Sequence, residues 1–121
     1  MEKPTKRTFT NLLDIPNEIP DIQDLGFDPY ESDKRSAFPF KGGERQALHR
    51  LQSYFWDSKN LATYKKTRNG LIGIDYSSKL SPWLANGSIS AKTIYWAIMD
   101  FEKKVVKNQD TYWLFFELVW R

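Results

Sequence analysis

The prolines of this 121-residue chain are concentrated in its N-terminal part, and they limit what that part can form. Five of the six prolines lie within residues 1–39. A proline inside a helix removes a backbone hydrogen bond and clashes with the preceding turn, so no long helix fits between them. We therefore expect residues 1–41 to form an extended connector between domains.

A helical pattern begins after Gly42-Gly43. Apolar residues then recur at spacings that place them on one face of a helix. The residues of this face are Ala47, Leu48, Leu51, Tyr54 and Phe55. A second short helix is expected over residues 59–66, and Asn69-Gly70 with Gly73 predicts a loop after it.

Further helices are indicated by the residues at their ends. Ser81-Pro82 is suited to begin a short helix that stops at Asn86-Gly87, because serine caps free N–H groups and proline fits the first turn. Ser90 is expected to cap a longer helix, and Asp110 a last helix. The apolar face of the longer helix consists of Ile94, Ile98, Phe101 and Val105.

The fold class predicted from these patterns is all-α, since no strand pattern stands out. The last helical pattern reaches Arg121 without a Gly, Asn or Pro to end it. We therefore expect that residues 42–121 form only part of a helical domain, truncated after Arg121.

Composition excludes several classes of protein. The absence of cysteine rules out a disulfide framework and a Cys-based metal site, and the single histidine, His49, has no histidine partner for a metal. No apolar run approaches the roughly 20 residues that span a bilayer, so we expect a soluble chain. Residues 43–92 carry eight basic and three acidic side chains, which suits either a phosphate-bearing partner or a solvated helix surface.

Hydroxyl groups and one cation gather before the short helix that begins at Ser81-Pro82. Ser77, Ser78, Lys79 and Ser81 lie where unpaired N–H groups and the helix dipole favour an anion. The alternative is that these serines only cap the helix.

Two other groups of residues leave alternatives open. Trp113, Glu117 and Trp120 share one face of the last helix, and Glu117 either belongs to a site or pairs with a lysine or arginine of a neighbouring helix, with both tryptophans in the core. The basic and aromatic stretch from Tyr64 to Arg68 either contacts phosphates or is a solvated face.

Several motifs, taken in order, resemble those of the cryptochrome/photolyase family. The first stretches are Phe40-Lys41-Gly42-Gly43-Glu44, Ala47-Leu48-x-Arg50-Leu51 and Tyr64-x-x-x-Arg68-Asn69. They are followed by Asp75-Tyr76-Ser77-Ser78-Lys79-Leu80-Ser81-Pro82-Trp83-Leu84 and by Thr111-Tyr112-Trp113-x-x-x-Glu117-Leu118-x-Trp120-Arg121. The resemblance covers roughly residues 38–121, is strongest to the DASH branch, and implies the N-terminal part of a helical FAD-binding domain.

The resemblance also implies roles for individual residues. It assigns the FAD diphosphate to Ser77, Ser78, Lys79, Leu80 and Ser81, and further FAD contacts to Tyr64 and Arg121. It makes Glu117 the active-site carboxylate and Trp120 the tryptophan that stacks on a damaged pyrimidine dimer. No metal is implied.

For a longer parent protein the resemblance implies light-driven repair of cyclobutane pyrimidine dimers in DNA, in particular single-stranded DNA. The alternatives are a flavin photoreceptor without repair activity and a stand-alone helical binding module. We expect the chain alone to bind FAD weakly and to lack repair activity. The compartment stays open: the cytoplasm for a bacterial source, an organelle or the nucleus for a eukaryotic one.

Overall fold

The structure, a computed structural model, describes residues 2–3, 20–29, 31 and 33–120. The chain divides into two units: one comprises Thr5–Ser36, and the other comprises Ala37–Arg121 together with Met1–Pro4. In the first unit the described residues form a turn, in which the amide of Gly26 donates to the carbonyl of Gln23 at 2.9 Å. The assignment of residues 1–41 to an interdomain connector stays a prediction.

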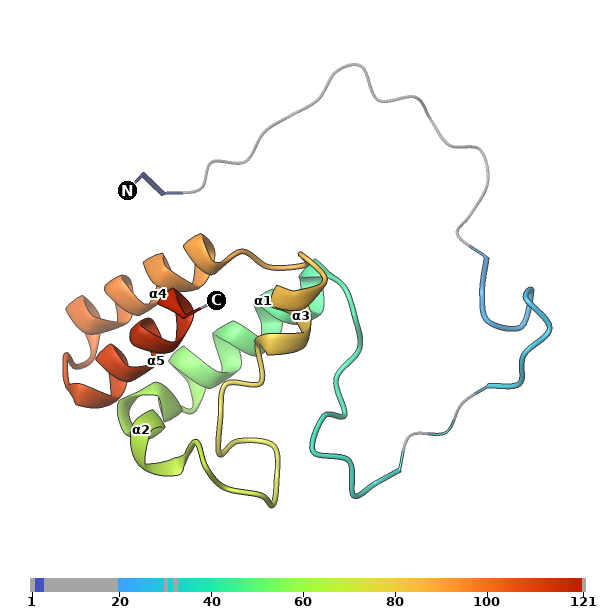
Figure 1. Cartoon of the computed structure of the whole chain (residues 1–121), viewed down its shortest axis with the longest axis horizontal. Helices are drawn as coiled ribbons and strands as arrows, with labels where there is room; N and C mark the ends of the chain where they lie inside the picture. The colour runs from blue at the N-terminus through green and yellow to red at the C-terminus, as the bar shows by residue number, and fades with distance from the viewer. Residues whose placement is uncertain (1, 4–19, 30, 32, 121) are drawn as a thin grey trace. The chain divides into compact units, whose positions relative to one another are not determined.

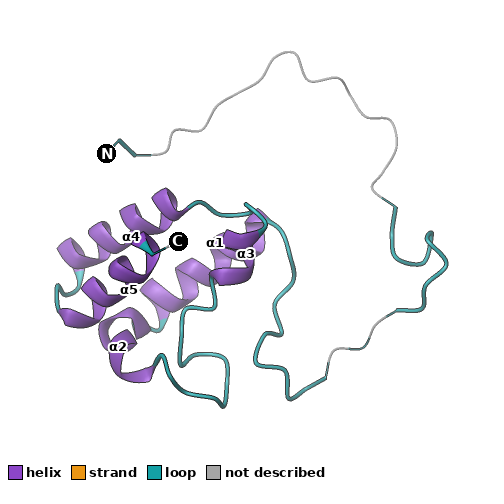
Figure 2. Cartoon of the chain, in the orientation of Figure 1, coloured by secondary structure: helices purple, strands orange, loops and turns teal. Residues whose placement is uncertain are grey.

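The second unit holds the helices (Figure 1). They are α1 (Glu44–Gln52), η1 (a π-helical turn, Ser53–Asp57), η2 (a 3-10 turn, Asn60–Thr63), α2 (Tyr64–Thr67), α3 (Ser81–Ala85), α4 (Ala91–Lys104) and α5 (Gln109–Val119). Figure 2 shows helices and loops and no strand in the described part of the chain. The prediction of an all-α fold is therefore confirmed.

Two of the predicted helix starts need correction. The cap of α5 is Asn108, whose side-chain oxygen accepts from the amides of Asp110 (2.9 Å) and Thr111 (3.0 Å). Asp110 therefore lies inside the first turn, where its carboxylate suits the helix dipole. In α3, Ser81 is already the first helical residue, and the preceding Leu80 offers no side-chain cap. The prediction for Ser90 is correct, since its hydroxyl accepts from the amide of Thr93 at 3.0 Å.

The core of the helical unit is made by the inner faces of the helices and by two residues of the connecting loops, Leu80 and Ile89. Its buried hydrophobic residues are Ala47, Leu51, Tyr54, Phe55, Leu61, Tyr64, Leu80, Trp83, Ile89, Ile94, Ile98, Phe101 and Leu114. Leu48 and Val105 do not belong to it, being 41% and 39% exposed. Val105 lies beyond the last residue of α4, because that helix ends at Lys104.

Helix α5 packs against three other elements. This helix lies beside α4, as Figure 1 shows, and also contacts η2 and α2. A hydrogen bond from the Thr111 hydroxyl to the Glu102 carboxylate (2.7 Å) joins α5 to α4. This packing leaves one end of α5 facing the loop that connects α2 to α3, and the cavity described below lies there.

Trp83 anchors α3 and the segment that precedes α1. Its indole is 1% exposed and contacts the rings of Phe38 and Phe40, with centroids 5.1 and 5.7 Å away. Its Nε1 donates to the carbonyl of Lys41 at 3.2 Å. Phe38 and Phe40, which the sequence places in the connector, are therefore part of the packing of the helical unit.

The cap of α4 gives a first prediction. Replacing Ser90 with Ala removes the acceptor for Thr93 and should lower the free energy of unfolding by about 1 kcal/mol. Ser90→Asp keeps an acceptor and adds a favourable charge at the helix N-terminus, so it should restore the wild-type value. Urea denaturation followed by circular dichroism measures the change. Ser88→Ala, two residues before the cap, is the control, and an equal loss there would contradict the assignment.

The buried phenol of Tyr54 gives a second prediction. Its hydroxyl forms no hydrogen bond of good geometry among the described residues, and burial raises the pKa of Tyr54 to about 12, which the nearby Thr67 side chain offsets only in part. The unfolded chain loses this proton near pH 10, before the folded chain does. The contribution of Tyr54 to the free energy of unfolding should therefore be fully present below pH 10 and be lost as the pH rises through 12.

Tyr54→Phe should remove this part of the pH dependence. The comparison requires urea denaturation between pH 8 and 12. The matched control is Tyr112→Phe, because Tyr112 is 55% exposed and should behave as the wild type does. The assignment would be wrong if both variants kept the wild-type pH dependence.

Candidate functional site

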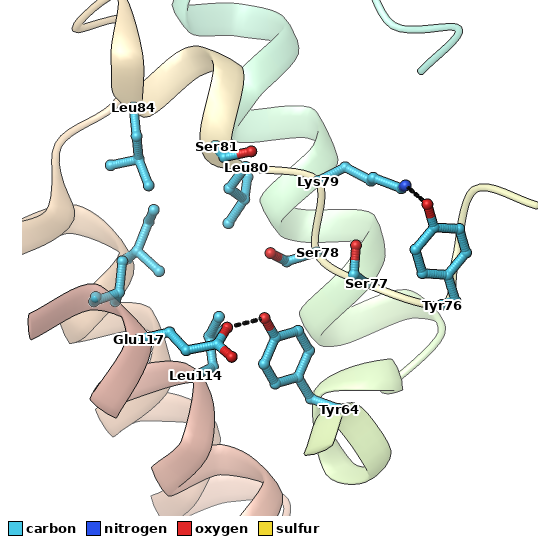
Figure 3. Close-up of a pocket in the computed structure, with 12 residues that line it drawn as sticks. Tyr64, Tyr76, Ser77, Ser78, Lys79, Leu80, Ser81, Leu84, Leu114 and Glu117 are labelled. Atoms are coloured by element: carbon cyan, nitrogen blue, oxygen red, sulfur yellow. Dashed lines mark hydrogen bonds between the residues drawn. The ribbon is translucent and has the colours of Figure 1, made fainter. Parts of the chain in front are cut away.

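A cavity of about 340 Å³ lies between the α2–α3 loop and helices α4 and α5 (Figure 3). This volume is within the usual range of small-molecule sites. Its lining residues are Tyr64, Tyr76, Ser77, Ser78, Lys79, Leu80, Ser81, Leu84, Ile94, Leu114, Glu117 and Leu118. One wall is therefore a polar loop, and the opposite wall carries a carboxylate among apolar side chains.

The loop wall offers hydroxyl groups and one cation. Figure 3 shows Ser77 and Ser78 along the loop, and neither hydroxyl forms a hydrogen bond within the described part of the chain. Lys79 donates to the hydroxyl of Tyr76, and its ammonium group lies 3.6 Å from the centre of that ring. The backbone of Lys79 is left-handed, with φ at +59°, which is uncommon for a residue with a side chain.

The start of this loop is fixed by a close approach at Gly70. A Cβ atom added there would lie 2.9 Å from the Cβ of Tyr76, closer than two such atoms can come. The loop tip, by contrast, is open to solvent, since Leu71 and Ile72 are 88% and 94% exposed. Tyr76 can therefore keep this position only if residue 70 is glycine. Because the Tyr76 hydroxyl accepts from Lys79, the position of Lys79 depends on Gly70 as well.

Three donors hold Glu117 on the opposite wall. Its carboxylate accepts from the Tyr64 hydroxyl, from Nη1 of Arg68 and, at 3.1 Å, from Nε1 of Trp113. Figure 3 shows the Tyr64 phenol pointing at this carboxylate. Burial and then the hydrogen bond to Glu117 raise the pKa of Tyr64 well above its ordinary value, so the phenol stays a neutral donor.

Most residues predicted for the site line this cavity. Those that do are Tyr64, Ser77, Ser78, Lys79, Leu80, Ser81 and Glu117. Trp120 does not: it is 77% exposed and contacts Phe116, with ring centroids 5.8 Å apart. Arg121 lies outside the described residues.

The alternatives left open by the sequence are partly resolved. Glu117 does pair with an arginine, Arg68 at the end of α2, but the pair lies beside the cavity and is not confined to a dry core. The exposure of Trp120 is incompatible with a place in the core. In the basic stretch, Lys65 and Lys66 are both exposed, and the Lys65 ammonium group lies 4.4 Å from the centre of the Trp113 ring.

Several residues of the site were not predicted from the sequence. Ile94, Leu114 and Leu118 form its apolar side, and Arg68 and Trp113 hold Glu117. The spacing of Leu114, Glu117 and Leu118 by three and four places them on one face of α5 and could have indicated the lining. No comparable signal in the sequence pairs Arg68 with Glu117.

The arrangement suits an organic anion. The serine hydroxyls and Lys79 provide donors and a positive charge on one wall, and Tyr64 presents its phenol on the other. Among the described residues no group of His, Asp or Glu side chains could hold a metal ion. None of the described helices is long and apolar enough to cross a membrane.

Comparison with known proteins places the chain among cryptochromes. It is 51% identical over 106 residues to a cryptochrome DASH of Gloeobacter violaceus, covering 88% of this chain and 21% of that protein. It is 54% identical over 103 residues to a cryptochrome DASH of Danio rerio, covering 85% of this chain and 20% of that protein. No family model matches.

Comparison of the fold with solved structures also identifies a cryptochrome. A crystal structure of a Synechocystis cryptochrome superposes with a TM-score of 0.77 at 48% identity, covering 84% of this chain and 21% of that one. The chain thus spans about a fifth of the length of the relatives it matches. With its helical fold, its motifs and these relatives in agreement, the chain belongs to the cryptochrome/photolyase family and corresponds to a segment of a DASH-type cryptochrome.

Proposed function

We propose that the chain provides the diphosphate side of an FAD site. The observation that carries this proposal is the position of Ser77, Ser78 and Lys79 on one wall of the cavity, with the serine hydroxyls free to donate. A diphosphate is a multiply charged acceptor, and hydrogen bonds to charged groups are the stronger ones. The nearby N-terminus of α3 adds backbone N–H groups that favour negative charge.

The other residues of the cavity fit the same ligand. Leu84, Ile94 and Leu118 offer apolar surface, and Tyr64 offers a neutral phenol. The negative charge of Glu117 is compensated by its ion pair with Arg68, which weakens its repulsion of a bound phosphate. The family resemblance adds Arg121 as a further contact to FAD.

For a longer protein that contains this chain, we propose light-driven repair of cyclobutane pyrimidine dimers in single-stranded DNA. The flavin would supply the light-driven electron transfer. Glu117 would present a carboxylate oxygen to the damaged base, with its position held by Tyr64, Arg68 and Trp113. Trp120 is exposed and free to stack on a base.

Titration with FAD tests the first proposal. The double variant Ser78→Ala, Lys79→Ala should weaken FAD binding at least about tenfold, because it removes a hydroxyl donor and a cation from the loop wall. Flavin fluorescence and absorbance measure the affinity. The matched control is Ser88→Ala, Lys92→Ala, which changes the same residue types away from the cavity. Unchanged binding by the double variant would place the phosphates elsewhere, and no binding by the helical wild-type chain would refute the proposal for this chain alone.

Repair is tested on a protein that contains this chain within a whole DASH-type cryptochrome. Blue light should split dimers in a single-stranded oligonucleotide, and Trp120→Ala should weaken binding of that oligonucleotide by about 1–3 kcal/mol, the usual value of one stacked base. Tyr112→Ala, which changes an exposed aromatic residue of α5, is the control. If blue light reduced the flavin without splitting dimers, the photoreceptor function would replace repair.

A further inference from the structure

The loop between α2 and α3 has little structure of its own. From Leu71 to Lys79 no backbone–backbone hydrogen bond is formed within the described part of the chain. Unpaired buried backbone groups are costly, so the carbonyls of such a loop need other partners. This is the same loop that presents Ser77, Ser78 and Lys79 to the cavity.

Arg50 of α1 supplies those partners. Its Nε donates to the carbonyl of Ser78 at 3.0 Å. Its Nη2 donates to the carbonyls of Ile74 at 2.8 Å and Ser77 at 3.0 Å. Its Nη1 binds the carboxylate of Asp75 at 2.8 Å. Every polar contact of the guanidinium within the described residues thus goes to residues 74–78.

The guanidinium is held in place from its other sides. Arg50 is only 4% exposed, and its Cζ lies 4.8 Å from the centre of the Phe40 ring and 5.0 Å from that of Tyr54. Asp75, its charged partner, has a side chain that is 57% exposed. The Arg50 side chain therefore extends from the core to the buried side of the loop. Its ion pair with Asp75 lies at the solvent-exposed side of the guanidinium.

We propose that Arg50 is a positioning residue for the phosphate wall of the site. By binding the carbonyls of Ile74, Ser77 and Ser78, it fixes the course of the loop from inside, so that the serine hydroxyls and Lys79 remain on the cavity side. A loop that is ordered before the ligand arrives does not have to be ordered by it, which improves affinity. The inference rests on the proposed FAD diphosphate site.

The planar fork of arginine is essential to this role. Lysine carries the same charge on a stem of similar length, but its ammonium group has three donors around one atom and cannot reach three separate carbonyls and a carboxylate. A residue needed only to fill the core would not require this geometry. Arg50→Lys therefore separates positioning of the loop from charge and packing.

The test combines two measurements on the whole chain. In ¹⁵N relaxation, the wild-type order parameters of residues 74–80 should be close to the value of about 0.85 typical of rigid backbone, and in Arg50→Lys they should fall below about 0.6 while those of α4 and α5 are unchanged. Titration with ADP and with FAD should show about tenfold weaker binding by Arg50→Lys. Arg45→Lys, an exposed position on the same helix, is the matched control.

The outcomes are distinct. Order parameters of residues 74–80 and affinities equal to those of Arg45→Lys would overturn the role of Arg50. If Arg50→Lys lost order throughout the helical unit, the measurement would be repeated at a lower temperature, at which α4 and α5 keep their wild-type order parameters. Loosening confined to residues 74–80 under those conditions supports the role, and loss of order throughout the unit even there would make Arg50 a core residue and overturn it. Failure of the wild type to bind ADP and FAD would refute the proposed function, while the order parameters would still decide whether Arg50 fixes the loop.

Discussion

The cavity wall that carries the serines is a loop without backbone–backbone hydrogen bonds between Leu71 and Lys79, so the site depends on side chains that hold this loop in place. In a sheet, the carbonyls of a connecting segment often accept hydrogen bonds from a neighbouring strand. The described residues of this chain form no strand, so the loop needs another kind of partner. Here a single guanidinium from α1 takes that place, since Arg50 has enough donors in one plane to bind several carbonyls. Helix α1 thereby determines the position of the serine-bearing wall of the cavity, although the two are separated by more than 20 residues along the chain.

The fold could largely be predicted from the chain because helix periodicity is a local property. In α4 the cap at Ser90 is confirmed, and so is the apolar face for Ile94, Ile98 and Phe101, whereas Val105 lies outside the helix. One error, Leu48, lies inside α1, where it is exposed. The others lie at element ends: Asn108 and Asp110 are both good caps, and only the observed backbone shows that Asn108 reaches the free amides. The π-helical turn after α1 also has no clear sequence signal.

The candidate site was less predictable, because it is made where elements meet. The polar loop wall is readily predicted because Ser77 to Ser81 are adjacent in sequence, whereas for Glu117 the spacing along the helix left open whether it belongs to a site or pairs with a cation. The roles of Arg68 and Arg50 have no signal in the sequence, because each resembles an ordinary surface cation when its helix is considered alone. Their partners lie 49 and 28 residues away along the chain, and spacing within one helix carries no information about such pairs.

The close contact at Gly70 has a consequence for how this segment can change in length. The loop is fixed at Gly70 by the Tyr76 side chain and, further along, by the carbonyls that bind Arg50. Between these two fixed points, Leu71 and Ile72 project into solvent and make no contact that the site requires. Insertions, deletions or a covalent label at the tip would therefore leave the serine wall in place, whereas one added residue on the site side of Tyr76 would displace it.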